Sequence, residues 1–134
     1  MRTFTIHLQE ATGTERIEGV ASFVGRDRTG SLGILAGRAR MMTALEFGLA
    51  RYRKPDSPWE YLALPGALLY MVENELFIST RRYLRGPDAD RMSRALEAQL
   101  LVEEEALRTL KESLLRMEEA LFKHLWRMKR VGAA

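Results

Sequence analysis

The sequence has no cysteine, only two histidines and no long apolar run, and each absence excludes a class of protein. Without cysteine the chain forms neither disulfides nor thiolate metal sites, which is compatible with a reducing cytoplasm. No apolar run approaches the ~18 residues that a membrane-spanning helix needs, and 29% of the residues are charged. The first residues, MRTFTIHLQEA, lack the apolar core of a secretory signal. We therefore expect 134 residues that fold outside the bilayer, as one compact domain or a small domain with an appendage.

Glycine and proline are almost confined to the first two thirds of the chain. Nine of the ten glycines and all four prolines lie between Met1 and Pro87, and neither residue occurs between Asp88 and Val131. Because both residues interrupt regular structure, the change at Gly86-Pro87 marks a boundary. The sequence predicts two parts, residues 1–87 and residues 88–134.

The first part has the two-residue periodicity of β-strands. Phe4, Ile6 and Leu8 alternate with polar residues, as in a strand with one buried face. Further short apolar runs follow at close spacing, separated by turn sequences such as Pro65-Gly66, and Val72-Glu73-Asn74-Glu75-Leu76 is typical of a tight hairpin. This pattern predicts an all-β sandwich or barrel over residues 1–87.

The second part has the periodicity of an amphipathic helix. Asp88 can cap its start, and one apolar row recurs every seven residues: Leu100, Leu107, Leu114, Leu121 and Met128. A single helix from Asp88 to Met128 would be ~60 Å long at ~1.5 Å per residue and would leave this row uncovered. We therefore expect an antiparallel helical hairpin over residues 88–134, or an extended long helix that packs on a partner. The candidate hinge, Thr109 to Ser113, contains neither glycine nor proline.

No pattern of catalytic residues is present. The glycines at positions 30, 33 and 37 are spaced like those of a phosphate-binding loop, but Arg38 follows where such a loop needs Lys and Ser/Thr. They are better explained as turn residues of a β-domain. His7 and His124 have no ligand partner at metal-binding spacing. We expect no catalytic residue, no metal and no cofactor.

The end of the predicted helix is basic. No acidic residue follows Glu119, whereas Lys123, Arg127, Lys129 and Arg130 do. Part of this pattern complements the helix dipole. The functional interpretation is a basic tip that docks on an acidic protein surface, since a nucleic-acid interface would need a denser patch with more aromatic residues.

The stretch GSLGILAGRARMMTALEFG, residues 30–48, resembles a signature of the epsilon subunit of F-type ATP synthases. The family pattern is Gly-acidic-aliphatic/aromatic-Gly-Ile-x-Pro-Gly-His-Ala-Pro-Leu-Leu-Thr-Ala-Leu. The positions in register here are Gly30, Gly33, Ile34, Gly37, Ala39, Thr43, Ala44, Leu45 and Gly48. The resemblance covers nearly the whole chain, because a β-sandwich followed by a helical C-terminal region is the family's order.

The resemblance implies a non-catalytic subunit in the central stalk of a bacterial ATP synthase, peripheral to the cytoplasmic face of the membrane. Its sandwich would pack on the gamma subunit and touch the membrane rotor ring through Ser31, Arg38, Ala39, Arg40, Met41 and Met42. Its C-terminal helices would lie folded or extended and restrain ATP hydrolysis by contacting the catalytic beta subunits. The residues placed at that contact are Arg116, Lys123, Arg127, Lys129 and Arg130.

The sequence departs from the family pattern in three places, one of which is Met41-Met42 in place of Leu-Leu. Ser31 replaces the acidic residue, and two arginines enter the Pro-Gly-His-Ala-Pro segment as Arg38 and Arg40, which fits a divergent, alternative or sodium-linked type with a complementary rotor ring. Some relatives bind ATP between their helices. Asp90, Lys123 and Arg127 fall at the matching positions, but lysine in place of arginine loses bidentate phosphate geometry, so we expect weak or absent ATP binding.

Two other functions remain open on the sequence. One is a free-standing regulatory module that senses a nucleotide or another small ligand through a cleft at Asp90 and Arg127. The other is a small basic nucleic-acid adaptor, which would bind DNA or RNA with a steep salt dependence. Neither the coupling ion, proton or sodium, nor the extent of the helices follows from the sequence.

Overall fold

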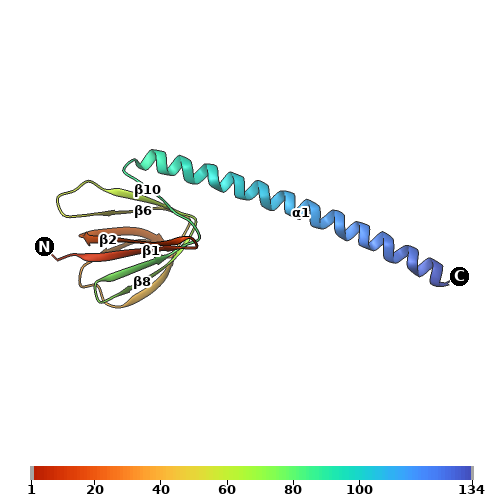
Figure 1. The fold of residues 1–134 in the computed structure, drawn as a ribbon, viewed down its shortest axis with the longest axis horizontal. Coiled ribbons are helices and arrows are strands. Elements are labelled where there is room, and N and C mark those ends of the chain that lie inside the picture. The colour runs from red at the N-terminus through yellow and green to blue at the C-terminus, as the bar shows by residue number, and fades with distance from the viewer. Residues whose placement is uncertain (1, 134) are drawn as a thin grey trace. The chain divides into compact units, whose positions relative to one another are not determined.

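The computed structural model describes residues 2–133, and the side chains of residues 2–129. It contains ten strands followed by one helix, as Figure 1 shows along the chain. The strands are β1 (Phe4–Glu10), β2 (Gly13–Val20), β3 (Ser22–Asp27), β4 (Gly30–Leu35), β5 (Met41–Leu45), β6 (Gly48–Arg53), β7 (Glu60–Leu64), β8 (Ala67–Val72), β9 (Glu75–Ser79) and β10 (Leu84–Gly86). The helix is α1 (Ala89–Ala133).

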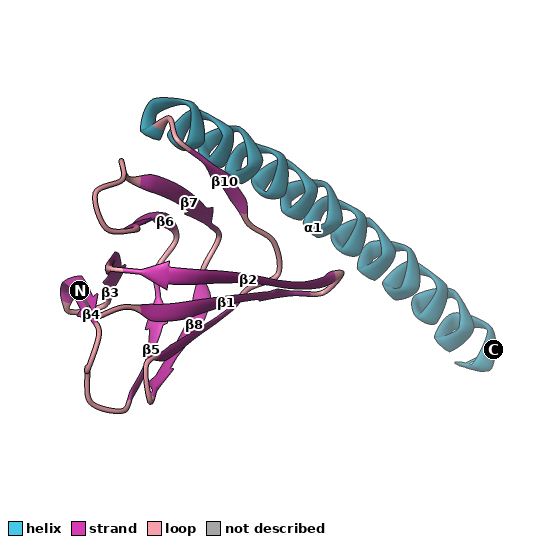
Figure 2. Cartoon of the chain, turned by 60° about the vertical axis from the view of Figure 1, so that its left-hand side comes forward, coloured by secondary structure: helices cyan, strands magenta, loops and turns pink. Residues whose placement is uncertain are grey.

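The strands form one sheet in the order β10-β7-β6-β3-β5-β8-β9-β1-β2, with β4 paired to β3. Every pair is antiparallel except β1 with β9. Figure 2 shows the sheet curling on itself, so that one face of it encloses a core. The predicted all-β sandwich or barrel is confirmed.

The inward residues of the strands fill that core with aliphatic and aromatic side chains. Phe4, Ile6 and Leu8 of β1 are almost completely buried, as their alternation predicted. Phe23, Ile34, Leu69 and Ile78 lie in the same cluster from other strands. No buried side-chain nitrogen or oxygen among the described residues lacks a hydrogen-bond partner. Among the described residues no polar or charged residue is buried, so the core is apolar.

The hairpin predicted between β8 and β9 is present. Val72 pairs with Glu75, so Glu73 and Asn74 form a two-residue turn. Both turn residues have positive φ, 46° and 60° respectively. Such turns match the twist of antiparallel strands, and asparagine tolerates the left-handed conformation better than most residues.

Helix α1 starts at the predicted cap. The Asp88 Oδ1 atom accepts hydrogen bonds from the backbone N–H groups of Asp90, at 3.0 Å, and Arg91, at 3.2 Å. These bonds satisfy two of the donors that a helix leaves free at its first turn, and the carboxylate meets the positive end of the helix dipole.

The structure differs from the expected antiparallel hairpin, because α1 is one continuous helix through Thr109–Ser113. That segment has no glycine or proline to break the helix, so the extended form expected as the second possibility is the one present. The hairpin over residues 88–134 stays a prediction for another state of the chain. No helix in the part of the chain that the structure describes is long and apolar enough to cross a membrane.

The compact β-unit extends past the boundary predicted at residue 87. It comprises Met1–Glu97, and Ala98–Ala134 form a second unit. A Cβ at Gly86 would lie 3.1 Å from the Met92 Cε atom, and Leu96 is 5% exposed. The first turns of α1 are therefore part of the β-domain's packing.

Candidate functional site

The residues predicted at the rotor ring lie at both ends of β4 and at the start of β5. Ser31 is an exposed residue of β4, and Arg38, Ala39 and Arg40 form the exposed link between β4 and β5. We call Arg38–Arg40 the basic rim. Met42 is 70% exposed, whereas Met41 packs against the core, so only one of the two methionines can dock on a partner.

The basic rim is anchored at its start by the β8–β9 turn. The backbone N–H of Gly37 donates to the Asn74 Oδ1 atom at 2.6 Å, and Gly37 has a φ of +83° that a side chain would strain. The N–H of Arg38 also donates to the Leu35 carbonyl at 3.3 Å. The two arginines that follow are therefore displayed from a fixed turn.

The turn before Ser31 is held by a carboxylate. Asp27 Oδ1 accepts from the backbone N–H of Thr29, at 2.9 Å, and from its hydroxyl, at 2.6 Å, while Oδ2 accepts from the Thr43 hydroxyl at 3.2 Å. These hydrogen bonds lower the pKa of Asp27 below its usual value, and the bond from the Thr29 hydroxyl has the largest effect.

An apolar outer face runs across β5, β8 and β9 beside the basic rim. Met42 pairs with Tyr70, and Tyr70 pairs with Phe77, so their side chains lie on one side of the sheet. Leu68, two residues from Tyr70, is 60% exposed. We call Met42, Leu68, Tyr70 and Phe77 the Met42 face. A shallow groove of about 390 Å³ lies along it, and the Arg40 guanidinium lies 5.6 Å from the Tyr70 ring centroid.

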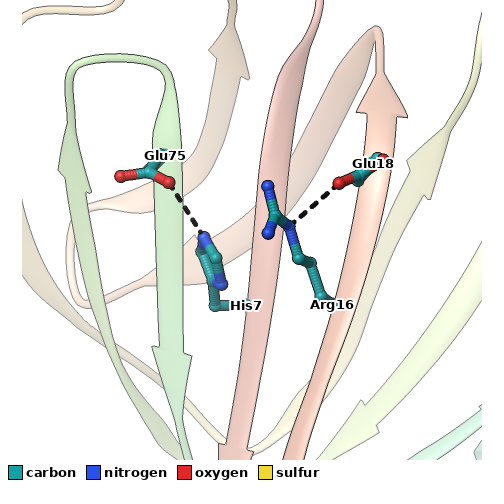
Figure 3. A network of polar contacts seen from close by, with 4 residues as sticks. All are labelled: His7, Arg16, Glu18 and Glu75. Atoms are coloured by element: carbon teal, nitrogen blue, oxygen red, sulfur yellow. Dashed lines mark hydrogen bonds and ion pairs between the residues drawn. The ribbon is translucent and has the colours of Figure 1, made fainter.

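His7 continues this face onto β1. Its ring stacks on Phe77 with centroids 4.6 Å apart, and its Nε2 atom lies 3.3 Å from Glu75 Oε1. Figure 3 shows this pair beside Arg16 and Glu18 of β2, which are joined at 3.1 Å. Glu75 and Phe77 are far from His7 in the sequence, so no local pattern could have indicated these contacts.

A second cluster that the sequence did not indicate joins β2 to the chain around β10. Glu15 accepts a hydrogen bond of 2.6 Å from the Tyr83 hydroxyl and forms an ion pair of 2.7 Å with Arg85. Burial and the bond to Glu15 raise the pKa of Tyr83 to about 12. Glu15 and Arg85 line an open polar cleft with Tyr52 and Lys54. Because Glu15 contacts both Tyr83 and Arg85, the cluster holds β2 to the chain around β10.

The predicted head-contact residues lie on α1. Arg116 is 3.9 Å from Glu112, one helical turn earlier, and Lys123, Arg127 and Lys129 are exposed. Arg130 lies in α1, but its side chain is outside the described ones. Large apolar residues on α1 are more than half exposed, among them Leu107, Leu110, Leu114, Met117, Leu121 and Leu125. An amphipathic helix with its apolar side chains in water is suited to a partner.

The residues considered for ATP binding are far apart along α1 and do not form a cleft. Asp90 lies in the first turn of α1, and Lys123 and Arg127 lie near its other end. A cleft between them requires the hairpin, so ATP binding there stays a prediction for that arrangement. Within the described residues, no group of three or more acidic or histidine side chains could hold a metal ion.

Comparison with known proteins gives a family for the β-domain. The family model for the β-sandwich domain of the ATP synthase delta/epsilon chain matches residues 3–86. The chain belongs to this family. Its epsilon-subunit character, expected from residues 30–48, is supported by curated relatives of that name.

Two relatives illustrate how the epsilon-family chain compares along its length. It is 29% identical to ATP synthase epsilon chain 2 of Cereibacter sphaeroides over 82% of this chain and 76% of that one. It is 42% identical to the ATP synthase epsilon chain of Nostoc punctiforme over 43% of each chain. The chain thus spans less than half of the cyanobacterial relative.

Solved structures share the fold of the epsilon-family chain. One is a chain of the Tetrahymena thermophila mitochondrial ATP synthase central stalk and c-ring, with a TM-score of 0.53 and 12% identity over 62% of this chain and 66% of that one. Another belongs to the Euglena gracilis mitochondrial ATP synthase, with a TM-score of 0.56 and 18% identity over 72% of this chain and 62% of that one. At these identities the likeness shows the fold alone.

Proposed function

We propose that the chain is a non-catalytic central-stalk subunit of a rotary ATP synthase that couples the gamma subunit and the membrane rotor ring to the catalytic head. The observation that carries this proposal is the Met42 face. A family β-domain exposes Met42 and Leu68 beside the cationic rim of Arg38 and Arg40. Exposed apolar groups bordered by charge are typical of a protein interface.

The two kinds of surface suit two partners. The Met42 face fits the gamma subunit, because apolar area removed from water supplies most of the free energy of a lasting interface. Ser31 and the basic rim fit polar loops of a rotor ring on the cytoplasmic side, where a complementary ring would carry acidic groups. Exposed ion pairs contribute only about 0–1 kcal/mol each, so the rim would set orientation more than affinity.

Helix α1 would supply the restraint on ATP hydrolysis. Its exposed apolar row can pack along another helix, and its terminal cations can meet acidic segments of the beta subunits. Restraint through Arg116, Lys123, Arg127, Lys129 and Arg130 requires this extended form of the helix to be present in the complex.

Co-purification with the gamma subunit tests the stalk role. Met42→Glu and Leu68→Glu should each weaken the complex by tenfold or more, about 1.4 kcal/mol, because a carboxylate would be desolvated in the contact. Leu35→Glu is the matched control, because Leu35 is similarly exposed, at 63%, but lies on β4. Equal gamma binding by all three variants, or no gamma binding by the unaltered chain, would refute the stalk role.

ATP hydrolysis by the assembled complex tests the restraint. The truncation should follow Glu97 rather than residue 87, because Met92 and Leu96 belong to the packing of the β-unit. Hydrolysis should rise when residues 98–134 are absent. An unchanged rate would remove the inhibitory role and leave the coupling role standing.

A further inference from the structure

A pair of arginines shares one tryptophan ring on the outer surface of the β-domain. The Arg51 guanidinium carbon lies 4.5 Å from the Trp59 ring centroid, and that of Arg53 lies 4.8 Å from it. Arg51 and Arg53 are alternate residues of β6, and Trp59 lies just before β7. We call these three residues the tryptophan–arginine surface. Stacking on the ring holds each guanidinium in place and leaves its N–H edge free to donate.

These two arginines have no carboxylate partner within the described side chains, unlike other arginines of the same domain. Arg16 pairs with Glu18 at 3.1 Å and Arg85 with Glu15 at 2.7 Å. The guanidiniums of Arg51 and Arg53 instead contact the Trp59 ring. Their Cα atoms are about 6.6 Å apart at roughly 3.3 Å per residue. Two like charges held so close gain from an anion that contacts both.

A groove with both apolar and polar walls adjoins the cations. It has a volume of about 370 Å³ and is lined by Val24, Leu49 and Tyr61, with Arg26 and Arg51 among its walls. Arg26 is exposed and adds a third cation. Its lining also includes Ser31 of β4, one of the residues predicted at the rotor ring, and none of the four residues of the Met42 face.

We propose that the tryptophan–arginine surface and this groove bind an extended, acidic segment of a partner protein. In an extended strand, alternate side chains point the same way at the same spacing as Arg51 and Arg53. Two carboxylates at such positions can each meet one guanidinium, and an aliphatic side chain of the segment can fill the groove. Paired guanidinium–carboxylate bonds are strong and directional.

Two other classes of anionic ligand fit the surface less well. A nucleic acid would use Trp59 to stack a base, and a membrane would use it to enter the interface. Here the ring is already engaged by both guanidiniums and is only partly exposed. The surface is therefore organised to present cations rather than an open aromatic face.

The test uses the full chain with Trp126→Phe, which leaves Trp59 as the only tryptophan. The probe is a synthetic peptide with two glutamates at alternate positions and a valine at the next alternate position, so that all three side chains share one face. The comparison peptide has the same composition with adjacent glutamates. Trp59 fluorescence and titration calorimetry should show saturable binding that favours the alternating peptide and weakens with added salt. Arg51→Gln and Arg53→Gln should each reduce affinity about tenfold. The control Arg16→Gln, at an exposed arginine of β2, should leave it unchanged.

The proposal fails if neither peptide binds, if both bind equally, or if the Arg51 and Arg53 variants keep full affinity. Tripolyphosphate and vesicles containing phosphatidylserine are titrated in parallel. Tripolyphosphate or the vesicles could bind more tightly than the peptide and lose that binding in the same arginine variants. This result would assign the surface to a phosphate ligand or a membrane and refute the proposal of an acidic protein segment. Circular dichroism of each variant verifies the fold, so lost binding is attributable to the side chain.

Discussion

The backbone N–H of Gly37 donates a hydrogen bond of 2.6 Å to the side-chain oxygen of Asn74, which lies 37 residues later in the chain. This bond ties the start of the basic rim to the β8–β9 turn. The Asn74 carbonyl also accepts from the Thr5 N–H at 3.0 Å, so the same residue links β1 to the turn. Asn74 therefore holds the start of the basic rim against the rest of the β-domain.

Asn74→Gly should free the rim without straining the turn. Glycine keeps the positive φ of 60° but removes the amide, so the loss should be about 0.5–1.5 kcal/mol of unfolding free energy in urea denaturation. Amide exchange at Gly37 and Arg38 should also speed up. Glu73→Gly, at the other positive-φ position of the turn, is the control and should keep slow exchange at Gly37. Equal protection of Gly37 in both variants would contradict the tether.

Leu96→Ala should destabilise the β-domain even though Leu96 lies in α1. The side chain is 5% exposed, and removing a buried leucine typically costs about 2–5 kcal/mol. Leu101→Ala is the control because Leu101, on the same helix, is 65% exposed. Urea denaturation of both variants would show the difference, and equal stability would mean that the helix start contributes nothing to the β-unit.

Acidification should weaken the β3–β4 turn through Asp27. Hydrogen bonds from Thr29 hold the pKa of Asp27 below the value of 3.8 expected for a free side chain. A lowered folded-state pKa contributes stability above the unfolded value, and this contribution is lost as the pH falls through the folded pKa. Thr29→Val removes the hydroxyl donor, so NMR titration of the Asp27 carboxyl should show a higher pKa. An unchanged pKa would mean that the Thr29 hydroxyl bond is not what lowers it.

At the alkaline end, Tyr83 should ionise at a higher pH than an exposed tyrosine, and burial raises the pKa of Tyr52 as well. Burial and its bond to Glu15 raise the pKa of Tyr83 to about 12, against 10.0 for a free phenol. The resulting stability is fully present below pH 10 and is lost as the pH rises through the folded value. Tyrosinate absorbance should show a late step that Tyr83→Phe reduces by the amplitude of one tyrosine and that Glu15→Gln moves partly to lower pH. The control Tyr61→Phe should retain the late step. Loss of the step in this variant would assign it to Tyr61 and not to Tyr83.

Much of the fold was predictable because it depends on local patterns. The alternation of Phe4, Ile6 and Leu8 predicted β1, and Asp88 was predicted as the cap of α1. The residues predicted at the rotor ring were indicated only by resemblance to a family. The structure shows that one of them, Met41, is partly buried and packs against the core. The hairpin expected over residues 88–134 was not distinguishable from a long helix, since the apolar row of α1 fits either arrangement.

The sequence by itself determined the division into a strand-rich part and a helical part and the absence of any thiol chemistry, because composition and periodicity are local properties. It indicated the family only through the resemblance of residues 30–48 to a family pattern. Only the tertiary structure decided which distant side chains meet: Gly37 with Asn74, Glu15 with Tyr83, and Arg51 and Arg53 with Trp59. It also joined the first turns of α1 to the β-domain through Met92 and Leu96. Those contacts depend on sheet register and on burial, which arise when the whole domain packs.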